Sequence, residues 1–398
     1  MDTATSVISQ LLVEFQDFEI DRSISNEDIF PKGTESKSMF RWSGQFPSRL
    51  AEILLDRYSK KDNIILDPFV GSGTVLFEAT KHLLECVGTD INPAAVTLSE
   101  TAKFCNMNSE LRKEYIEKLY IIIKKLIDSF DKQTKNGGKF TINDYLFIKN
   151  KINSIKDQNL RNLLLNVLMR LSISEEKYTA NGLIKSFHIH SKIIEELPYS
   201  GKSCRVFNSD ARELPLKSKS IDLIITSPPY PGIFDYYKNY KKIMHLAGWS
   251  ITETSKKEIG HGKGTGNRFL ELINYANDMS KALLEMRRVL KEKGRLILVV
   301  NHESKIKNFK FQNSGLLYII ATATSGFQMV MKQERNFKNR HGDEFQEDIL
   351  HLIPSRSIFK KSGRYPSEAV AYLLEKIINP SDIQSRKLLE DALNVFSE

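Results

Sequence analysis

One segment of the chain joins an apolar run to a rigid polar end. The run SIDLIITS (220–227) has the composition of a buried strand and leads directly into Pro228, Pro229 and Tyr230. Proline has no amide hydrogen to donate to a sheet, so the pair ends the strand and stiffens the chain that follows. Ser227 adds a hydroxyl at this point, and Tyr230 adds an aromatic ring. The motif therefore predicts a preorganised ligand site at a strand end.

A second chemical signal is the glycine-rich turn in LDPFVGSGTV (66–75). Asp67 ends a strand-like run, and Gly71 and Gly73 follow before a helical pattern begins. In open α/β sheets, ligands bind beyond the carboxyl ends of the strands, and glycine lets the backbone approach a ligand because it has no Cβ. The turn therefore predicts a second ligand-binding strand end.

The residues around this turn limit the classes of ligand that it can bind. Leu76 breaks the G-x-G-x-x-G pattern of dinucleotide sites, and no Gly-Lys-Ser/Thr follows as in a P-loop. Asp67 would repel a phosphate but would attract an ammonium group. The next strand ends at Asp90, a place where an acid commonly accepts hydrogen bonds from ribose hydroxyls. An ammonium, a ribose and no pyrophosphate together indicate S-adenosylmethionine as the cofactor.

The spacing of apolar residues around both motifs predicts an α/β fold. A strand-like run (63–69), a helical run (74–84) and a second strand-like run (86–91) form a βαβ unit, which implies parallel strands. Helical spacing recurs at 7–16, 46–59, 271–292 and 367–378, and strand-like runs recur at 204–210, 220–227, 294–302, 327–334 and 348–353. We expect a doubly wound, mostly parallel sheet of about seven strands.

Residues 105–200 interrupt this alternation with a Lys-, Ile- and Leu-rich stretch of helical period. We divide the chain into N-terminal helices with the cofactor-binding half of the sheet (1–104), a helical insertion (105–200), the catalytic half of the sheet (201–355) and a helical C-terminal tail (356–398). Lys- and Asn-rich helices can contact nucleic-acid phosphates, but helical insertions also serve as scaffolds. The composition leaves target recognition and scaffolding both open for the insertion.

The composition is that of a globular protein with an excess of positive charge. The net charge is +9, which suits a polyanionic partner. The three cysteines have no paired spacing, so disulfides and Cys-ligated zinc are disfavoured and a reducing cytoplasm is expected. The HIH pair at 188–190 has no further ligand cluster nearby, so we expect no metal. The chain contains no run of 18 apolar residues, so we expect no membrane span.

The sequences DPFVGSGTV and TSPPY together resemble the amino-methylating, S-adenosylmethionine-dependent DNA methyltransferases, which have a Rossmann-like sheet. The Ser-Pro-Pro-Tyr form resembles the cytosine-N4 branch, whereas most adenine-N6 enzymes carry Asp or Asn in place of Ser227. The resemblance covers roughly 40–100 and 204–353 and does not extend to the insertion or the tail. In many relatives with DPFxGSGT the Pro-Pro-Tyr motif comes first in the chain, so the order here is permuted.

The resemblance implies roles for individual residues. The implied catalytic residues are Ser227, Pro228, Pro229 and Tyr230. The implied cofactor-binding residues are Phe46, Pro47, Asp67, Pro68, Phe69, Gly71, Gly73, Thr74, Asp90, Ile91, Asp210 and Ala211, with Asp90 at the ribose and Asp210 at the adenine amine. Candidate nucleic-acid contacts are His261, Lys263 and Arg268, from the glycine-rich HGKGTGNRF, and Arg340, between the last two strands.

The chemistry of methyl transfer to cytosine explains the Ser-Pro-Pro-Tyr motif. The exocyclic amine is a poor nucleophile because its lone pair is delocalised into the ring. Ser227 Oγ and the Pro228 carbonyl can accept the amine hydrogens and so favour a pyramidal nitrogen, with little reorganisation during the reaction. The target base must leave the duplex to reach this site, where Tyr230 offers a stacking surface.

Several functions are compatible with these residues. The expected activity is cytosine-N4 methylation of duplex DNA, within a restriction–modification system that includes a cognate endonuclease. Adenine-N6 methylation on the same scaffold and guanine-N2 methylation of transfer RNA are alternatives, and so is a non-catalytic nucleic-acid-binding subunit. Carbon-5 methylation is disfavoured because it needs a cysteine nucleophile beside proline at a strand end.

Overall fold

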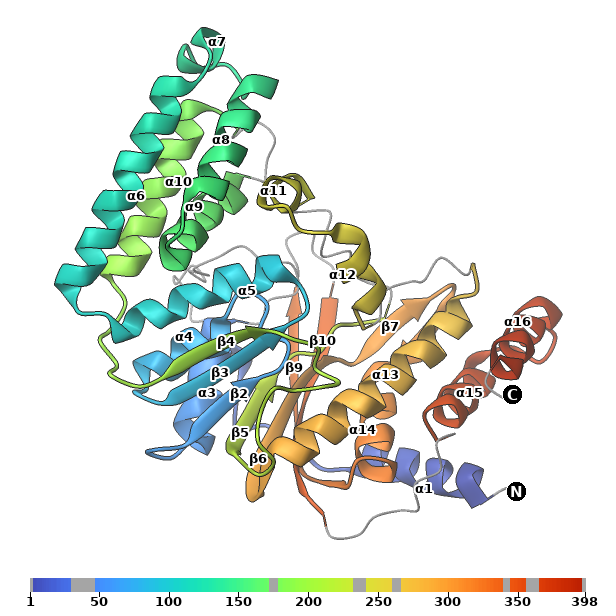
Figure 1. Ribbon diagram of the computed structural model, residues 1–398. Helices are drawn as coiled ribbons and strands as arrows, with labels where there is room; N and C mark the ends of the chain where they lie inside the picture. Colours follow the sequence, from blue (N-terminus) through green and yellow to red (C-terminus); the bar gives the residue numbers. More distant parts are fainter. Residues whose placement is uncertain are drawn as a thin grey trace.

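The computed structural model describes residues 3–29, 47–171, 178–231, 241–259, 266–338, 344–355 and 365–395. Its centre is an eight-stranded sheet (Figure 1). In sheet order the strands are β1 (Ile20–Asp21), β9 (Phe327–Lys338), β10 (Glu344–Pro354), β6 (Leu290–Asn301), β5 (Ile221–Thr226), β2 (Ile64–Asp67), β3 (Glu85–Asp90) and β4 (Cys204–Asn208). The five strands from β6 to β4 are parallel, and β10 is antiparallel to both of its neighbours. The fold is therefore a doubly wound, mostly parallel α/β sheet.

The strand order reverses between β2 and β5. From β2 the chain runs through α4 (Thr74–Lys81) to β3 and later to β4, whereas β5 lies on the other side of β2 and leads to β6. The register places Ile65 opposite Leu223 and Leu66 opposite Ile224. The carboxyl ends of β2 and β5 are therefore adjacent at the point where such sheets bind their ligands.

Helices cover both faces of the sheet and enclose two apolar cores (Figure 1). One core includes residues of α3 (Ser48–Tyr58), α4 and α5 (Pro93–Ser99), and the other includes residues of α1 (Thr3–Asp17), α13 (Arg268–Val289), α14 (Asn313–Ala323) and α15 (Tyr365–Ile377). Successive strand residues alternate between the two, so that Ile65 joins the first core and Leu66 the second. The apolar runs in the sequence are continuous because both faces are buried.

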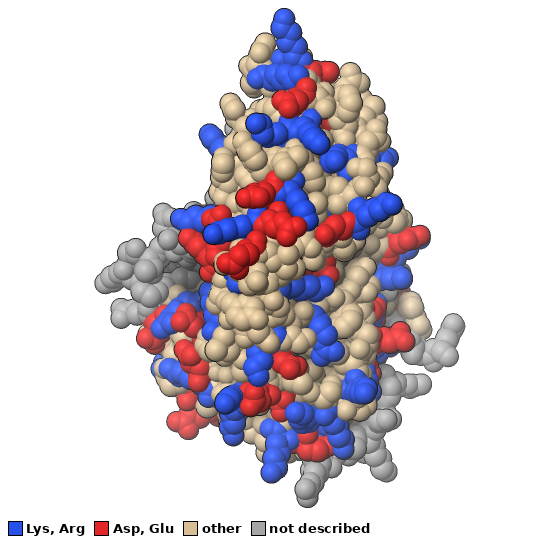
Figure 2. All heavy atoms as spheres, turned by 60° about the vertical axis from the view of Figure 1, so that its left-hand side comes forward, with Lys and Arg blue, Asp and Glu red and all other residues tan. Residues whose placement is uncertain are grey.

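Residues 109–195, within the connection between β3 and β4, form a group of helices that stands at one end of the sheet (Figure 1). They are α6 (Ser109–Ser129), α7 (Lys132–Lys135), α8 (Ile142–Ser154), α9 (Gln158–Leu171) and α10 (Ala180–Glu195). The Ser200 amide donates a 2.9 Å hydrogen bond to the Cys105 carbonyl, which brings the two ends of the insertion together at its base. On the face shown in Figure 2, Lys and Arg are interspersed with Asp and Glu over these helices.

The insertion also contacts the segment that follows the Ser-Pro-Pro-Tyr motif. Helices α8 and α9 pack against α11 (Lys241–Ala247). The Arg161 guanidinium of α9 donates to the Ala247 carbonyl at 3.2 Å, and the Lys242 ammonium of α11 lies 5.0 Å from the centre of the Tyr178 ring. The insertion is therefore attached to α11, which follows the Ser-Pro-Pro-Tyr motif in the chain.

All seven predicted strands are present, but the prediction was incomplete. It missed β1 and a separate two-stranded sheet of β7 (Glu303–Ile306) and β8 (Phe309–Gln312). It also placed the end of the long helix at 292, whereas α13 ends at Val289 and β6 begins at Leu290. Among the described residues, every helix is too short or too polar to cross a membrane.

Candidate active site

The glycine turn after β2 is fixed by bonds to two carboxylates. The Phe69 amide donates to Asp67 Oδ1 at 3.1 Å, and the Gly71 amide donates to Asp90 Oδ2 at 3.0 Å. Gly73 has φ 89°, and a Cβ there would lie 2.9 Å from the Ser99 Cα, so only glycine fits this position. The acids that end β2 and β3 therefore hold one compact turn between them.

Asp67 also bonds directly to the strand that carries the Ser-Pro-Pro-Tyr motif. The hydroxyl of Thr226, the last residue of β5, donates to Asp67 Oδ1 at 2.6 Å. Both side chains are buried, and burial raises the pKa of Asp67 to about 7 against the opposing effect of the two hydrogen bonds. The cofactor turn and Ser227 are thus adjacent, which is the relationship that the sequence predicted.

Asp90 joins the turn to the end of β4. Its Oδ1 accepts the Asn92 amide at 2.9 Å, and the Asn208 side-chain amide donates to the Asp90 and Ile91 carbonyls at 2.9 and 3.0 Å. Burial raises the pKa of Asp90 to about 6, although the residue keeps an accessible fraction. Each Asp90 oxygen has a lone pair beyond the one that its amide donor uses, so the carboxylate can still accept a ligand hydroxyl.

The Ser-Pro-Pro-Tyr segment leaves the sheet in a partly exposed conformation. Pro228 is buried, whereas Ser227, Pro229 and Tyr230 keep accessible surface. The Ser227 hydroxyl lies 3.3 Å from the Tyr230 hydroxyl, within hydrogen-bond distance. A hydroxyl pair and an aromatic ring therefore stand beside the end of β5, next to the Asp67 turn.

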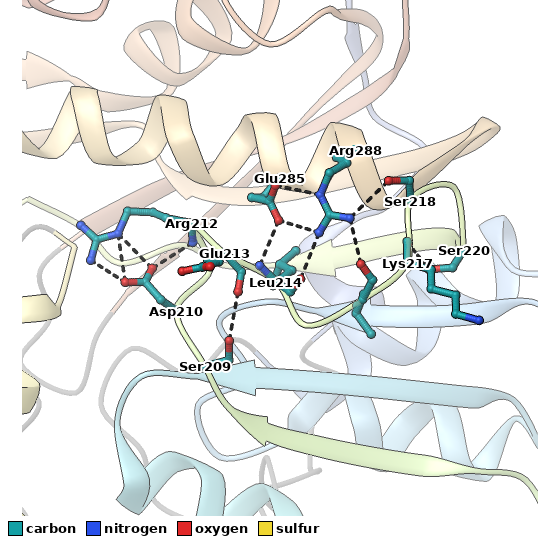
Figure 3. A network of polar contacts seen from close by, with 11 residues as sticks. Ser209, Asp210, Arg212, Glu213, Leu214, Lys217, Ser218, Ser220, Glu285 and Arg288 are labelled. Carbon is teal, nitrogen blue, oxygen red and sulfur yellow. Dashed lines mark hydrogen bonds and ion pairs between the residues drawn. The ribbon is translucent and has the colours of Figure 1, made fainter.

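Asp210 follows β4 and binds an arginine (Figure 3). The Arg212 guanidinium donates to both Asp210 oxygens, at 2.6 to 3.1 Å, and also bonds Asp278 of α13 at 2.8 Å. The hydrogen bonds from Arg212 to Asp210 raise the pKa of the guanidinium. Any ligand that reaches Asp210 must share its carboxylate with Arg212, and the adenine contact stays a prediction.

A second arginine fixes the loop between Asp210 and β5 to α13 (Figure 3). Glu285 accepts the Leu214 amide at 3.0 Å and binds Arg288, whose guanidinium donates to the Leu214 and Leu216 carbonyls at 3.0 and 2.8 Å. These contacts position the connection that begins at Asp210.

The remaining predicted residues fall into three groups. Pro47 is the N-cap of α3, Thr74 begins α4, the Pro68 carbonyl accepts the Thr89 hydroxyl at 3.0 Å, and Ala211 is buried in the second core. Arg268 begins α13 and pairs with Glu271 at 2.8 Å. Phe46, His261, Lys263 and Arg340 lie outside the described residues.

The residues of the turn fit S-adenosylmethionine. The buried Ser72 hydroxyl has no hydrogen-bond partner among the described residues, and Asp67 and Asp90 present carboxylates on either side of it in the chain. Sequence reasoning missed Thr226, Ser72 and Asn208. Thr226 immediately precedes Ser227, but a threonine at a strand end has no distinctive signal.

Comparison with known proteins matches the glycine turn to a family model. A family model described as DNA methylase, for N6 and N4 methyltransferases, matches residues 16–101, which include the glycine turn and Asp90. The chain is 21% identical to the Type II methyltransferase M.MjaII of Methanocaldococcus jannaschii, over 70% of this chain and 74% of that one. It is 24% identical to the Type II methyltransferase M.BsoBI of Geobacillus stearothermophilus, over 62% of this chain and 65% of that one.

Among solved structures, a SAM-dependent methyltransferase from Methanosarcina mazei aligns over 76% of this chain and 98% of that chain, with 12% identity and a TM-score of 0.36. The family model includes the end of β2 and its glycine turn, and it ends before β5. The chain is similar to the S-adenosylmethionine-dependent amino-methyltransferases of the N6/N4 methylase family.

Proposed function

We propose that this protein transfers a methyl group from S-adenosylmethionine to the N4 amine of cytosine in duplex DNA, at a specific site. The observation that supports this most directly is the 2.6 Å hydrogen bond between Thr226 and Asp67. It puts the cofactor turn beside a Ser-Pro-Pro-Tyr motif, and the serine at 227 favours cytosine over adenine.

The cofactor supplies an electrophilic methyl group when it is bound. Asp67 would attract its ammonium, Asp90 would accept its ribose hydroxyls, and Asp210 would accept its adenine amine beside Arg212. Gly71 and Gly73 leave room for the backbone to approach the methionine portion. These assignments use one residue from the end of each of β2 and β3, together with Asp210 just after β4.

The Ser227 hydroxyl and the Pro228 carbonyl would accept the two hydrogens of the target amine. This arrangement directs the nitrogen lone pair along the line of attack, and the fixed proline backbone reduces reorganisation. The amine becomes strongly acidic once it is alkylated, so Ser227 or water can take the proton late. Tyr230 would stack on the flipped base, which costs a few kcal/mol to extract from the duplex and regains about 1–3 kcal/mol by stacking.

Two observations support DNA as the substrate. Two relatives that the chain matches bear the name Type II methyltransferase, and the chain carries a net charge of +9. We therefore propose a restriction–modification role with a cognate endonuclease that recognises the same sequence. The contact of α8 and α9 with α11 favours the insertion as a target-recognition element, because α11 follows the Ser-Pro-Pro-Tyr motif in the chain.

Mass analysis of nucleosides tests the target base. DNA from cells that express the protein should contain N4-methyldeoxycytidine, and cells that express Ser227→Ala should show far less. N6-methyladenine alone would replace the cytosine assignment with the adenine-N6 alternative, because the matching family model covers both amines. A protein that binds S-adenosylmethionine and methylates transfer RNA in preference to duplex DNA would contradict the DNA assignment.

A further inference from the structure

The ribbon formed by β7 and β8 has one buried face and one exposed face, which carries Lys305, Lys310 and Glu303. Ser304, Ile306 and Phe311 are buried, whereas Lys305 and Lys310 are exposed. This alternation is typical of a two-stranded ribbon that packs one face on the protein and presents the other to solvent. The exposed face therefore consists of side chains that the fold itself does not require.

The two lysines are direct cross-strand neighbours. The register pairs Lys305 with Lys310, and like charges directly opposite one another destabilise a sheet. Glu303 is 3.7 Å from the Lys310 ammonium, but both side chains are substantially exposed, so this pair offsets little of the repulsion. Within the described residues no carboxylate pairs with Lys305. An anion between the two ammonium groups would remove this unfavourable arrangement.

The charged face lines a wide cleft of about 1030 Å³. The opposite wall is the end of the β9–β10 hairpin, where Phe337 pairs with Phe345 and the rings stack at 5.8 Å. Asn308 and Asn336 also line the cleft, as do the side chains of Glu303 and Glu344. Lysines, side-chain amides and an aromatic pair are the groups that bind phosphate, sugar and base in nucleic acids.

A histidine connects the two walls of the cleft. The His302 amide donates to the Gln346 carbonyl at 2.9 Å, and its ring Nδ1 lies 2.8 Å from Oδ2 of the buried Asp348. This contact with Asp348 raises the pKa of His302. The cleft is therefore a built feature with hydrogen-bonded walls.

The cleft lies on the catalytic edge of the sheet. β6 is parallel to β5, with Leu298 opposite Thr226, and Asn301 at the end of β6 lines the cleft. The ribbon starts two residues after β6 ends. Ser227, which follows Thr226, and the cleft are thus at the ends of neighbouring parallel strands.

We propose that this cleft binds the phosphodiester backbone beside the target nucleotide, with Lys305 and Lys310 as phosphate contacts. The proposal rests on the proposed function, since it assumes a nucleic-acid substrate at Ser227. It assigns the ribbon, which the sequence did not reveal, a role in holding the strand near the catalytic end of β5.

The salt dependence of duplex binding tests the proposal. Each phosphate contact contributes about 0.9 to the slope of log Kobs against log salt concentration. Lys305→Gln and Lys310→Gln should each lower the slope for a labelled mixed-sequence duplex by about 1, and the double variant by about 2. Lys305→Arg should retain the wild-type slope, and S-adenosylmethionine affinity should be unchanged in all variants.

Lys293→Gln is the matched control, because Lys293 is an exposed lysine at the amino end of β6, on the opposite edge of the sheet. If the ribbon variants match this control while the wild-type enzyme methylates DNA, the cleft proposal is wrong and the proposed function stands. If the wild-type enzyme neither binds the duplex measurably nor methylates DNA, the cleft proposal and the proposed function are both wrong. Loss of binding to an acidic protein partner with an unchanged duplex slope would also overturn the assignment to nucleic acid.

Discussion

Thr226 donates a 2.6 Å hydrogen bond to Asp67 across 159 residues of sequence, and both side chains are buried. The bond joins the last residue of β5 to the last residue of β2. It fixes the distance between the cofactor turn and the strand end that carries Ser227. A single contact thus couples the stability of the sheet to the geometry of the site.

Thr226→Val should destabilise the protein and weaken cofactor binding. Valine has a similar shape but leaves the buried Asp67 oxygen with one donor fewer, which costs about 1–3 kcal/mol. Urea denaturation followed by circular dichroism measures the change in free energy of unfolding. Thr226→Ser, which keeps the hydroxyl, should recover most of it. Equal losses in both variants would show that packing, and not the hydrogen bond, determines the effect.

The affinity for S-adenosylmethionine should fall as the pH drops below 7. Burial raises the pKa of Asp67 to about 7, above that of a free aspartate, so the cofactor-free protein favours the neutral acid at low pH. An ammonium ligand prefers the ionised form, and binding at pH 6 therefore has to release a proton. We expect binding about tenfold weaker at pH 6 than at pH 7.5.

Calorimetry in two buffers of different ionisation enthalpy would measure both the affinity and the proton release. In Asp67→Asn the pH dependence over this range should largely disappear, while overall binding is weaker. Burial raises the pKa of Asp90 to about 6, so protonation of Asp90 should lower the affinity for the cofactor further at lower pH. An affinity that stays constant from pH 5.5 to 7.5 in the wild-type protein would contradict the assignment of Asp67 to the ammonium.

Ser227→Ala and Tyr230→Ala should lower the rate of methylation and leave cofactor binding nearly intact. Neither residue belongs to the turn that would hold the cofactor, and Tyr230 would stack on the base with about 1–3 kcal/mol. Single-turnover methylation should therefore slow by about tenfold or more for Tyr230→Ala, whereas Tyr230→Phe should retain most of the rate. Comparable losses of cofactor affinity in the alanine variants would place these residues in the cofactor site.

Asp90→Ala should have the opposite effect. Its main result should be a lower affinity for S-adenosylmethionine. The variant removes the acceptor of the Gly71 and Asn92 amides as well as the expected partner of the ribose hydroxyls. The dissociation constant should rise by about tenfold or more, since hydrogen bonds to charged groups contribute about 1.5–3 kcal/mol. Asp128→Ala, an exposed acid of α6, is the control. If Asp90→Ala binds S-adenosylmethionine with normal affinity, the assignment of Asp90 to the ribose hydroxyls is wrong.

Gly73→Ala should destabilise the protein more than Gly137→Ala. Both glycines have positive φ, 89° and 96°, so both substitutions strain the backbone. At Gly73 a Cβ would also meet the Ser99 Cα at 2.9 Å, whereas no atom lies within 4 Å of a Cβ at Gly137. The first variant should lose at least about 1 kcal/mol more in denaturant titration. Equal losses of stability in the two variants would mean that α5 can move away from the added Cβ at no cost in free energy.

The sequence predicted the sheet well because its signals are local. Ile64–Asp67 and Ile221–Thr226 are apolar runs that end at chemical motifs, and both faces of the sheet bury them. The reversal of strand order between them then follows from general rules of α/β topology. The position of the two motifs on one edge could therefore be inferred before any coordinates were known.

The contacts that depend on distant residues could not be inferred. Nothing near Thr226 in the sequence indicates Asp67 as its partner, and nothing near Asp210 indicates Asp278, which binds the same arginine. The ribbon at 303–312 was missed because its exposed lysines obscure a short apolar alternation. β1 is two residues long, which is too short for a periodic signal.

The hydrogen bond between Ser200 and Cys105 has an evolutionary consequence. The helical insertion leaves and rejoins the sheet at neighbouring points, so it forms a module whose exchange need not alter the pairing of β3 with β4. Insertions at such closely spaced points are well tolerated by folded domains. Any replacement for the helices would have to keep the surface of α9 that meets the sheet domain, where Asn166 donates to the Thr97 carbonyl at 3.1 Å and to the Thr101 hydroxyl at 2.8 Å.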